Sequence, residues 1–366
     1  MTPLAAPVSA PVATKRLGLV AEFIMGQAPP GGDCNKERRG TVFVKAGEFA
    51  DRFPIVCEWT TRPLKLAKSG DVLVCVVGAT AGKINLAIDC AIGRSVAAIR
   101  PSAHLATEFL YHFLATKVLF LRAQSQGLAQ GVITRDMLNN LEIPLPPLVE
   151  QRRIAEVLGR AEDLRAKRRT ALAQLDAITQ SLFLEFFGMP KENAKGWPLV
   201  PLMEICSPKQ WPTISTPELT QTGFPVFGAN GLIGHYTEYN HEEPTVLITC
   251  RGATCGTINV SPPQCYVTGN AMALDNPDPQ RITIEYLESV LKMRSMADTI
   301  SGTAQPQITR QNLQHVTLPV PPLSLQQEYA RRIAAVETLK TSQRASLQDM
   351  DALFASLQHR AFRGEL

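Results

Sequence analysis

The sequence predicts an α/β fold in which two similar α+β globular domains, in a pseudo-twofold arrangement, are separated by an antiparallel coiled-coil pair of long helices. Three observations predict it. The chain repeats itself at an offset of 175 residues, strand and helix patterns recur at matching places in the two copies, and each copy ends in a heptad pattern. A repeat of this length implies two equivalent halves, and therefore a target or partner that is met twice.

The repeat is tightest around two proline-rich stretches. Residues 130–135 (Gln-Gly-Val-Ile-Thr-Arg) recur as residues 306–310 (Pro-Gln-Ile-Thr-Arg), and no gap is needed from Gly127 and Gly302 to Phe187 and Phe362. Other residues that recur in this stretch are Pro144, Pro146, Pro147, Leu148, Gln151, Ala155 and Leu182, as Pro319, Pro321, Pro322, Leu323, Gln326, Ala330 and Leu357.

Bulk composition favours several domains and no membrane span. The chain has 366 residues, of which 45% are hydrophobic, and no apolar run approaches the roughly 18 residues that a transmembrane helix needs. Residues 1–14 are rich in Pro and Ala and lack the basic-then-apolar order of a signal peptide, so we expect a disordered lead and a cytoplasmic location.

The cysteines and histidines predict no metal site. None of the eight Cys forms a Cys-x-x-Cys pair, and Cys250 and Cys255 stand five apart without a histidine at zinc-finger spacing. The six His form no His-Glu-x-x-His motif. We expect buried, reduced thiols and no bound metal.

Charge is unevenly spread along the chain. Residues 15–148 carry 16 Lys and Arg against 11 Asp and Glu, whereas residues 191–322 carry 8 against 11. The first segment could hold a polyanion through its charge alone, and the second could not.

Strand and helix signals occur at corresponding places. Residues 70–78 show a turn, an apolar β-rich run and a glycine stop, which predict a buried strand, and residues 107–121 have helical apolar spacing with Thr107 as N-cap. In the second copy, residues 245–250 predict the strand and residues 284–296 the helix.

Proline-rich stretches set the predicted boundaries. Residues 143–148 and 318–323 cannot continue a helix or a central strand, so each is expected to be a stiff hinge into the next helix. The predicted parts are the lead (1–14), globular segment 1 (15–148), helical spacer 1 (149–190), globular segment 2 (191–322), and helical spacer 2 with a tail (323–366).

The helical spacers carry matching apolar seams, each interrupted by one polar residue at the same register, Arg168 and Gln343. Two such stripes are expected to pack on each other, and about 38 residues give a rod of about 57 Å. The alternative is two helices docked separately on their own domains. The predicted seam residues are Leu158, Ala161, Leu164, Leu172, Leu175, Ile178, Leu182 and Phe186, then Tyr329, Ile333, Val336, Leu339, Leu347, Met350, Leu353 and Leu357.

A glycine-rich motif also recurs. Residues 78–85 (Gly-Ala-Thr-Ala-Gly-Lys-Ile-Asn) match residues 252–259 (Gly-Ala-Thr-Cys-Gly-Thr-Ile-Asn), and residues 92–95 loosely match residues 268–271, pairing Arg94 with Asn270. The motif is one residue short of a phosphate-binding loop, Lys83 is followed by Ile84, and the second copy has no Lys, which argues against nucleotide hydrolysis. It is either a strand-to-strand turn or a loop whose backbone N–H groups and Lys83 face a DNA phosphate.

These residues resemble a known family. Two globular segments, each followed by Pro-x-Pro-Pro-Leu, a glutamine-containing helix start and a long helix, resemble the specificity subunit of type I restriction–modification enzymes. Residues 361–366 (Ala-Phe-Arg-Gly-Glu-Leu) look like the typical end of that family, and residues 196–205 look like the usual opening of its second target-recognition domain.

The resemblance implies a function without catalysis. Each globular segment would read one half of a split site on double-stranded DNA, and the helices would fix the gap and dock two methyltransferase subunits. Those subunits would bind S-adenosylmethionine and methylate adenine, and a translocating restriction subunit would use ATP and Mg²⁺. Independently, the sequence has no Asn/Asp-Pro-Pro-Tyr/Phe motif, no complete Walker motif and no defensible carboxylate pair.

Arg and Asn are favoured as candidate DNA contacts because they pair two-pronged with guanine and adenine edges, and residues 36–39 form a basic turn. Arg135 and Arg310 share one register, so phosphate contact, helix capping or a structural role fits them better than specificity. The candidates are Lys36, Arg38, Arg39, Lys83, Asn85, Arg94 and Arg135 in segment 1, and Asn230, His235, Arg251, Thr254, Asn259, Asn270 and Arg310 in segment 2.

Candidate methyltransferase contacts lie on the faces of the helices away from the seam, where the alternative is a solvated charged face. They are Arg152, Arg153, Arg160, Arg165, Arg331, Arg332 and Arg344. Two other interpretations of the whole chain stay open: a two-armed coiled-coil adaptor without a DNA role, and a stand-alone DNA-binding protein.

Overall fold

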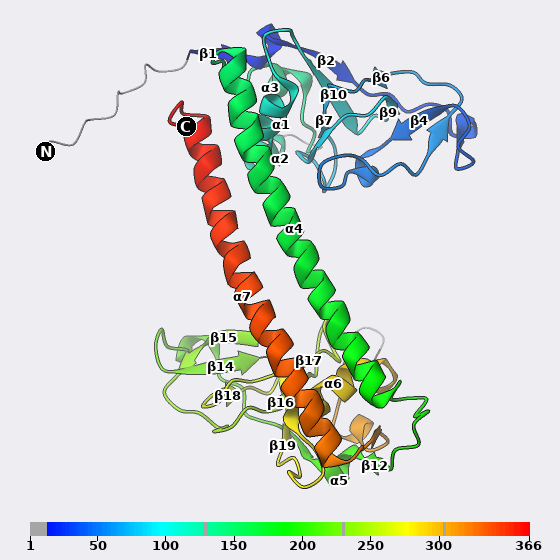
Figure 1. The fold of residues 1–366 in the computed structure, drawn as a ribbon, viewed down its shortest axis with the longest axis vertical. Helices are drawn as coiled ribbons and strands as arrows, with labels where there is room; N and C mark the ends of the chain where they lie inside the picture. The colour runs from blue at the N-terminus through cyan, green and yellow to red at the C-terminus, as the bar shows by residue number, and fades with distance from the viewer. Residues whose placement is uncertain (1–12, 127–130, 229–230, 303–304) are drawn as a thin grey trace, which may run out of the picture. The chain divides into compact units, whose positions relative to one another are not determined.

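The computed structural model describes residues 13–126, 131–228, 231–302 and 305–366, which form two compact units (Figure 1). Unit 1 comprises residues 1–169 and 345–366, and unit 2 comprises residues 170–344. Helices α4 (Leu148–Phe187) and α7 (Leu323–Ala361) therefore each belong to both units. Of the predicted N-terminal lead, residues 1–12 lie outside the described residues, and Thr14 already belongs to a strand.

The globular part of unit 1 contains eleven strands in three sheets and three α-helices among the described residues, with short 3-10 turns between them. Its helices are α1 (Thr107–Thr116), α2 (Val118–Gln126) and α3 (Arg135–Asn139). The strands are β1 (Thr14–Arg16), β2 (Ala21–Met25), β3 (Cys34–Asn35), β4 (Thr41–Val44), β5 (Trp59–Thr60), β6 (Leu66–Ala67), β7 (Val72–Cys75), β8 (Ile84–Leu86), β9 (Cys90–Ile92), β10 (Val96–Pro101) and β11 (Glu142–Pro144). The sheet orders are β1-β11, β2-β10-β7-β8 and β3-β5-β4-β9-β6.

The central sheet of unit 1 is covered on both faces. Val72 and Val74 of β7 pack with α1, whereas Leu73 and Cys75 pack with residues of the five-stranded sheet. Because successive side chains of a strand point to opposite faces, a strand enclosed on both sides must be apolar throughout. That requirement explains the uninterrupted apolar run that identified β7 in the sequence.

The globular part of unit 2 has the same plan. Its helices are α5 (Leu202–Ile205) and α6 (Ile284–Arg294). Its strands are β12 (Leu199–Pro201), β13 (Ser207–Gln210), β14 (Phe224–Gly228), β15 (Gly231–Tyr236), β16 (Val246–Thr249), β17 (Ile258–Val260), β18 (Tyr266–Val267), β19 (Ala271–Asp275) and β20 (Thr317–Pro319). The sheet orders are β12-β20, β13-β19-β16-β17 and β15-β14-β18, so the first two sheets repeat those of unit 1 and the third differs.

The predicted strands and helices are present, with two local corrections. Residues 107–121 do not form one helix, because α1 ends at Thr116 and α2 begins at Val118. Thr107 is not the N-cap: Ala106 holds that position, and the Thr107 hydroxyl donates to the Gly70 carbonyl at 2.8 Å. In the second copy Thr283 does cap α6, accepting from the Tyr286 N–H.

The proline-rich stretches were predicted to be hinges over their whole length, but the first residues of each form the end of a short strand. Pro144 ends β11 and Pro319 ends β20, and each of these strands has one partner only, β1 or β12. A two-stranded sheet tolerates proline because its outer side needs no N–H donor. The prolines that follow these strands lead directly into α4 and α7.

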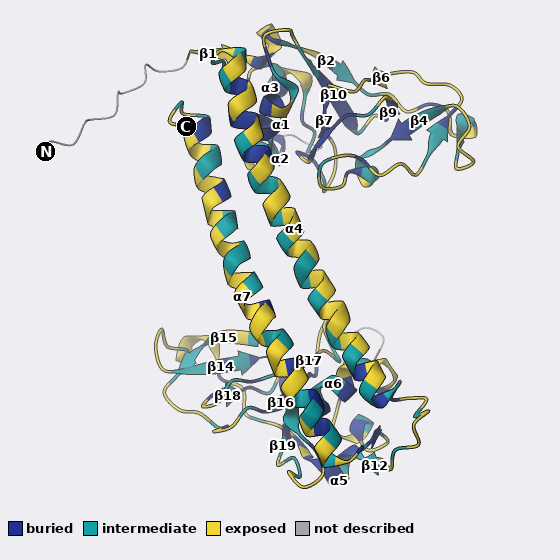
Figure 2. Ribbon diagram, viewed as in Figure 1, coloured by how far each residue is buried: buried dark blue, intermediate teal, exposed yellow. Residues whose placement is uncertain are grey.

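Within each unit, α4 and α7 run antiparallel and contact each other, so the predicted packing of the two stripes is confirmed. The predicted seam is partly wrong, because it departs from the strict alternation of three and four residues. On α4, counting from Ala161, that alternation selects Arg165 and Thr179 in place of Leu164 and Ile178. On α7, counting from Val336, it selects Lys340 and Phe354 in place of Leu339 and Leu353. Lys340 and Phe354 are buried and Arg165 and Thr179 half-buried. Figure 2 shows that the buried residues of both helices lie mainly toward their ends.

Reciprocal ion pairs set the register of the two helices. In unit 1 Arg165 donates to Asp351 at 2.5 Å, and its guanidinium lies 4.3 Å from the centre of the Phe354 ring. In unit 2 the repeat-equivalent residue, Lys340, contacts Asp176, which is equivalent to Asp351, at 2.9 Å. A buried charge that is paired in one register only penalises every other register.

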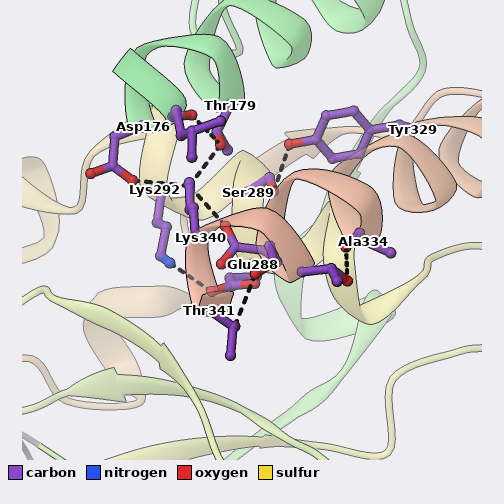
Figure 3. Close-up of polar contacts among 12 residues, drawn as sticks. Asp176, Thr179, Glu288, Ser289, Lys292, Tyr329, Ala334, Lys340 and Thr341 are labelled. Carbon is purple, nitrogen blue, oxygen red and sulfur yellow. Dashed lines mark hydrogen bonds and ion pairs between the residues drawn. The ribbon is translucent and has the colours of Figure 1, made fainter. Parts of the chain in front are cut away.

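Figure 3 shows Lys340 between Asp176 and Thr179 of α4. Its ammonium donates to the Thr179 hydroxyl and to Glu337, both at 2.8 Å. Burial alone would lower the pKa of Lys340, but the hydrogen bonds to Glu337 and Asp176 outweigh burial and raise it. Lys340 therefore remains charged inside the helix pair.

A buried glutamine fastens each globular part to the helix that follows it. The side chain of Gln151 accepts from the Ala106 N–H at 2.8 Å and donates to the carbonyls of His104 and Pro146. Gln326 makes the same three bonds, to the Thr283 N–H and to the carbonyls of Arg281 and Pro321. Each side chain thereby satisfies backbone groups at the start of α1 or α6 and at the entry of α4 or α7.

His112 lies where α1 meets the end of α7 within unit 1. Its ring is buried against Tyr111 and Phe354, with ring centres 5.0 and 6.5 Å away. Burial lowers the pKa of His112 to about 4, and the nearby Arg52 guanidinium acts in the same direction. On α4, burial raises the pKa of the Glu162 carboxyl, which accepts from the Tyr111 hydroxyl.

We expect Gln326→Leu to lower the free energy of unfolding by about 3 kcal/mol or more, because three buried backbone groups lose their partner. Urea denaturation of the full chain measures this. Gln151→Leu should behave alike, whereas Leu at the neighbouring exposed Gln327 should change stability by less than about 0.5 kcal/mol. Equal effects of Gln326→Leu and Gln327→Leu would refute the fastening role.

We expect the contribution of His112 to stability to be complete above about pH 6.5 and to disappear as the pH falls toward about 4, because the unfolded chain takes up the proton first. The full change is about 3 kcal/mol. The measurement is the difference in unfolding free energy between His112→Phe and the wild type as a function of pH, which cancels the opposing titration of Glu162. Phe at the exposed His359 should leave the profile unchanged.

Candidate nucleic-acid interface

Three segments of unit 1 meet at the end of the central strand β7. The Val76 N–H donates to the Ser95 carbonyl at 2.8 Å, and the Val76 carbonyl accepts from the Ile133 N–H at 2.9 Å. The β7–β8 turn, the turn that contains Arg94, and the segment that leads to Arg135 are therefore joined at one end of the sheet.

Unit 2 builds the same junction from the equivalent residues. The Cys250 N–H donates to the Asn270 carbonyl at 3.1 Å, and the Cys250 carbonyl accepts from the Ile308 N–H at 2.9 Å. An isolated bridge pairs Arg251 with Gln307, as Val77 pairs with Val132 in unit 1. The repeated Ile-Thr-Arg motif thus has a structural explanation: the buried isoleucine closes the junction.

The glycine-rich motif is a strand-to-strand turn. In unit 1 the N–H groups of Ala81, Gly82 and Lys83 donate to carbonyls of the same hairpin, so these three groups are not available to a phosphate. Gly82 has φ +84°, and a Cβ there would approach Val118 at 3.1 Å, so both the turn and the packing of α2 require glycine. The Lys83 side chain is exposed.

The structure gathers about half of the predicted DNA contacts at the two junctions. Those of unit 1 are exposed side chains at or beside the strand end: Lys83, Arg94 and Arg135. Those of unit 2 are likewise exposed: Arg251, Thr254, Asn270 and Arg310. Thr134 and Thr309, rather than the arginines that follow them, cap the next turn, accepting from the N–H groups of Met137 and Asn312. Arg135 and Arg310 are therefore not needed as caps.

Strand pairing corrects the loose alignment of the two copies. Val96 lies opposite Cys75, and Ala271 lies opposite Thr249, which makes Arg94 equivalent to Gly269 and Ser95 equivalent to Asn270. The pairing of Arg94 with Asn270 was therefore wrong by one residue. The two junctions differ more in side chains than the sequence suggested.

Asn85 is withdrawn as a DNA contact. It is completely buried in β8, its amide donates to the Ala50 and Ile84 carbonyls, and its oxygen accepts from the Ala50 N–H. All its hydrogen bonds serve the protein interior. The equivalent Asn259 in β17 is half-buried and also makes interactions within the chain.

The remaining candidates lie elsewhere. Lys36, Arg38 and Arg39 are exposed on the turn between β3 and β4, where Asn35 bonds both backbone groups of Arg39 and the Arg38 guanidinium lies 5.8 Å from the Trp59 ring centre. His235 is half-buried in β15. Asn230 lies outside the described residues.

Most candidate arginines on the helices are exposed and paired with a neighbouring carboxylate. Arg153 bonds Glu150 and the Leu366 carbonyl, Arg160 bonds Glu156, and Arg331 and Arg332 bond Glu328. Arg152 and Arg344 are exposed as well. Arg165 is the exception: it lies in the contact between α4 and α7, so its assignment to an outward face was wrong.

Four aliphatic residues expected in the seam are instead exposed. They are Leu164 and Leu353 in unit 1, at 54% and 57% exposure, and Ile178 and Leu339 in unit 2, at 46% and 53%. Each precedes a seam position by one residue, and equal heptad positions of antiparallel helices lie on the same side of the seam. Each unit therefore presents one apolar pair on its helices. The sequence did contain a signal for this arrangement. Strict heptad spacing places Arg165 and Lys340 in the seam, and Asp351 and Asp176 are available as their ion partners.

Two other kinds of feature are absent from the described parts of the chain. No group of three or more potential metal-ligating side chains is present there, and no helix there is long and apolar enough to cross a membrane. The cysteines are free thiols, five of them buried, although Cys57 is exposed.

Comparison with known proteins agrees with this architecture. The family described as "Type I restriction modification DNA specificity domain" matches the chain twice, at residues 10–174 and 194–348. The putative type I restriction enzyme MjaX specificity subunit of Methanocaldococcus jannaschii is 32% identical over 164 residues, which are 44% of this chain and 38% of that protein. The EcoBI specificity subunit of Escherichia coli is 30% identical over 130 residues, 33% of this chain and 27% of that protein. The chain thus matches well under half the length of these curated relatives.

Two solved structures share the fold. The type I restriction–modification S subunit from M. genitalium superimposes with a TM-score of 0.66 at 17% identity, covering 99% of this chain and 98% of the other. A chain from a study of complex assembly and conformational transition of the type I R-M system gives a TM-score of 0.55 at 22% identity, with both chains fully covered. With both copies of the repeat matched by the family and the whole fold shared, the chain belongs to the family of type I restriction–modification specificity subunits.

Proposed function

We propose that each globular part recognises one half of a bipartite site on double-stranded DNA. The observation that carries this proposal is the repeated strand-end junction: one backbone frame, closed by the same hydrogen bonds, displays Lys83, Arg94 and Arg135 in unit 1 and a different set in unit 2. A shared frame with different exposed donors suits two readers of different base sequences, because base identity is read by side chains and the frame only positions them.

We further propose that α4 and α7 set the spacing between the half-sites and dock two methyltransferase subunits. The apolar pairs Leu164/Leu353 and Ile178/Leu339 support this better than the exposed arginines do, because exposed ion pairs between neighbours contribute little to binding whereas apolar anchors contribute much. Because the two pairs occupy the same register of the repeat, the chain offers one surface twice, as two copies of one partner require.

Catalysis and cofactors belong, in this proposal, to the partners. The chain acts as a non-catalytic subunit, S-adenosylmethionine is bound by the methyltransferase subunits, and ATP and Mg²⁺ by a restriction subunit. The family assignment supports this division, since specificity subunits supply target choice to the complex.

We expect Arg251→Ala and Arg94→Ala each to weaken binding of the assembled complex to its cognate DNA about 10- to 100-fold and to relax specificity in one half-site only. Footprinting and binding titrations at fixed salt measure this. Lys292→Ala, an exposed basic residue of α6 that belongs neither to a junction nor to the candidate helix contacts, is the matched control. A continuous footprint instead of a split one would favour a stand-alone DNA-binding protein, and absence of DNA binding with partners present would favour the adaptor interpretation.

We expect Leu164→Ser with Leu353→Ser to reduce the bound methyltransferase from two subunits to one, and Ile178→Ser with Leu339→Ser to do the same, because each double change removes one apolar anchor pair. Analytical ultracentrifugation of the co-expressed complex gives the stoichiometry. Serine at the exposed Gln174 and Gln348 of the same helices should leave it at two. If the variant that combines all four serine substitutions still bound two methyltransferase subunits, this surface would be excluded as the docking site.

A further inference from the structure

The acidic balance of unit 2 comes from one insert. Residues 26–71 join the first and central strands of the main sheet in unit 1, and residues 211–245 do so in unit 2. The first insert carries 8 Lys and Arg against 6 Asp and Glu, whereas the second carries four Glu and no Lys or Arg. Since residues 191–322 have a net charge of −3 and this insert alone has −4, the remainder of that segment is +1.

The same insert supplies two of the three strands of the third sheet of unit 2, β14 and β15, and the third strand is β18. Val226 of β14 is completely buried, and β15 pairs with β14 at the outer edge of the sheet (Figure 1). Leu232 and Ile233 of β15 are 56% and 49% exposed. The β14–β15 pairing shifts register here, since Leu232 lies opposite Phe227 and Gly234 opposite Val226, so Ile233 is the extra residue of a β-bulge. The β14–β15 ribbon therefore offers two adjacent exposed aliphatic side chains at the edge of the sheet.

Glutamates flank this ribbon along the chain, since Glu218 precedes β14 and Glu238, Glu242 and Glu243 follow β15. The Ser215 N–H and hydroxyl donate to Glu218 at 2.9 and 2.6 Å, which fixes that side chain in place. Burial first, and then Tyr236, Glu238 and Glu218, raise the pKa of Tyr266, which pairs with Val226 on the side of β14 opposite β15. The Glu218 and Glu238 carboxylates therefore lie near the β14–β18 side of the sheet. The exposed aliphatic residues therefore belong to an insert that carries four Glu, and the insert has no Lys or Arg to hold a phosphate.

We propose that the β14–β15 ribbon is a docking arm for a protein whose surface carries basic residues around an apolar site. The proposal rests on the proposed function, in which that protein is the methyltransferase subunit bound beside unit 2. DNA affinity depends on cations that replace counterions at the phosphates, and this insert supplies none. Apolar side chains within a rim of one charge sign are typical of a protein interface with a complementary rim.

The test uses the full chain with the methyltransferase subunit of the same system. Leu232→Ser with Ile233→Ser should weaken binding of one of the two methyltransferase subunits about tenfold, measured by calorimetry without DNA. DNA affinity at saturating methyltransferase should change less than twofold. The matched control replaces Ile55 and Leu66, exposed aliphatic residues of the basic insert in unit 1, by serine and should leave methyltransferase binding unchanged.

A second variant guards against misfolding. Glu238→Lys keeps the ribbon apolar and should weaken the same binding step while reducing its dependence on salt. Reduced DNA affinity with normal methyltransferase binding would show that the ribbon contacts DNA, and unchanged behaviour in both assays would remove any docking role; either result overturns the proposal. If the wild-type chain itself binds no methyltransferase, the proposed function fails before the variants are compared.

Discussion

A buried glutamine at the entry of each long helix is the constraint on which the rest of the architecture depends. Gln151 and Gln326 each close three backbone groups that would otherwise be buried without partners, and they join the start of a domain helix to the start of α4 or α7. The direction in which each helix leaves its globular part follows from these bonds. The reciprocal pairs Arg165–Asp351 and Lys340–Asp176 then fix the register in which α4 and α7 pack against each other.

The sequence predicted the elements of the fold well because their signals are local. The apolar run of β7 and the gap-free repeat each reflect a requirement that a short stretch must satisfy by itself. The prediction of the seam was wrong at the positions where a residue on one helix depends on a partner on the other helix. Leu164 and Leu339 were preferred to Arg165 and Lys340 because they are apolar, yet a buried cation is acceptable when the opposite helix supplies Asp351 or Asp176. Hydrophobicity along one helix does not reveal that partner.

The candidate site was likewise predicted correctly only where the sequence signal is local. The repeat marked the loops that close a strand end in each unit, and these loops carry Arg94 and Arg135 in unit 1 and Arg251 and Arg310 in unit 2. Asn85 was misplaced because a motif does not reveal which of its side chains face inward, and the Ala50 backbone that occupies its amide is 35 residues away. His112 gave no sequence signal at all: its environment is made by Phe354, from the far end of the chain.

The division of the helices between the units has a consequence for the order of folding. Unit 2 is one continuous stretch, residues 170–344, whereas unit 1 combines residues 1–169 with residues 345–366. Phe354 and Ala361 complete the buried core of unit 1, so that core cannot close until all of unit 2 has been synthesised. Unit 1 therefore needs contacts between residues that are far apart in the sequence, and such contacts form slowly. During translation part of its apolar core stays exposed to solvent, while unit 2 can already fold.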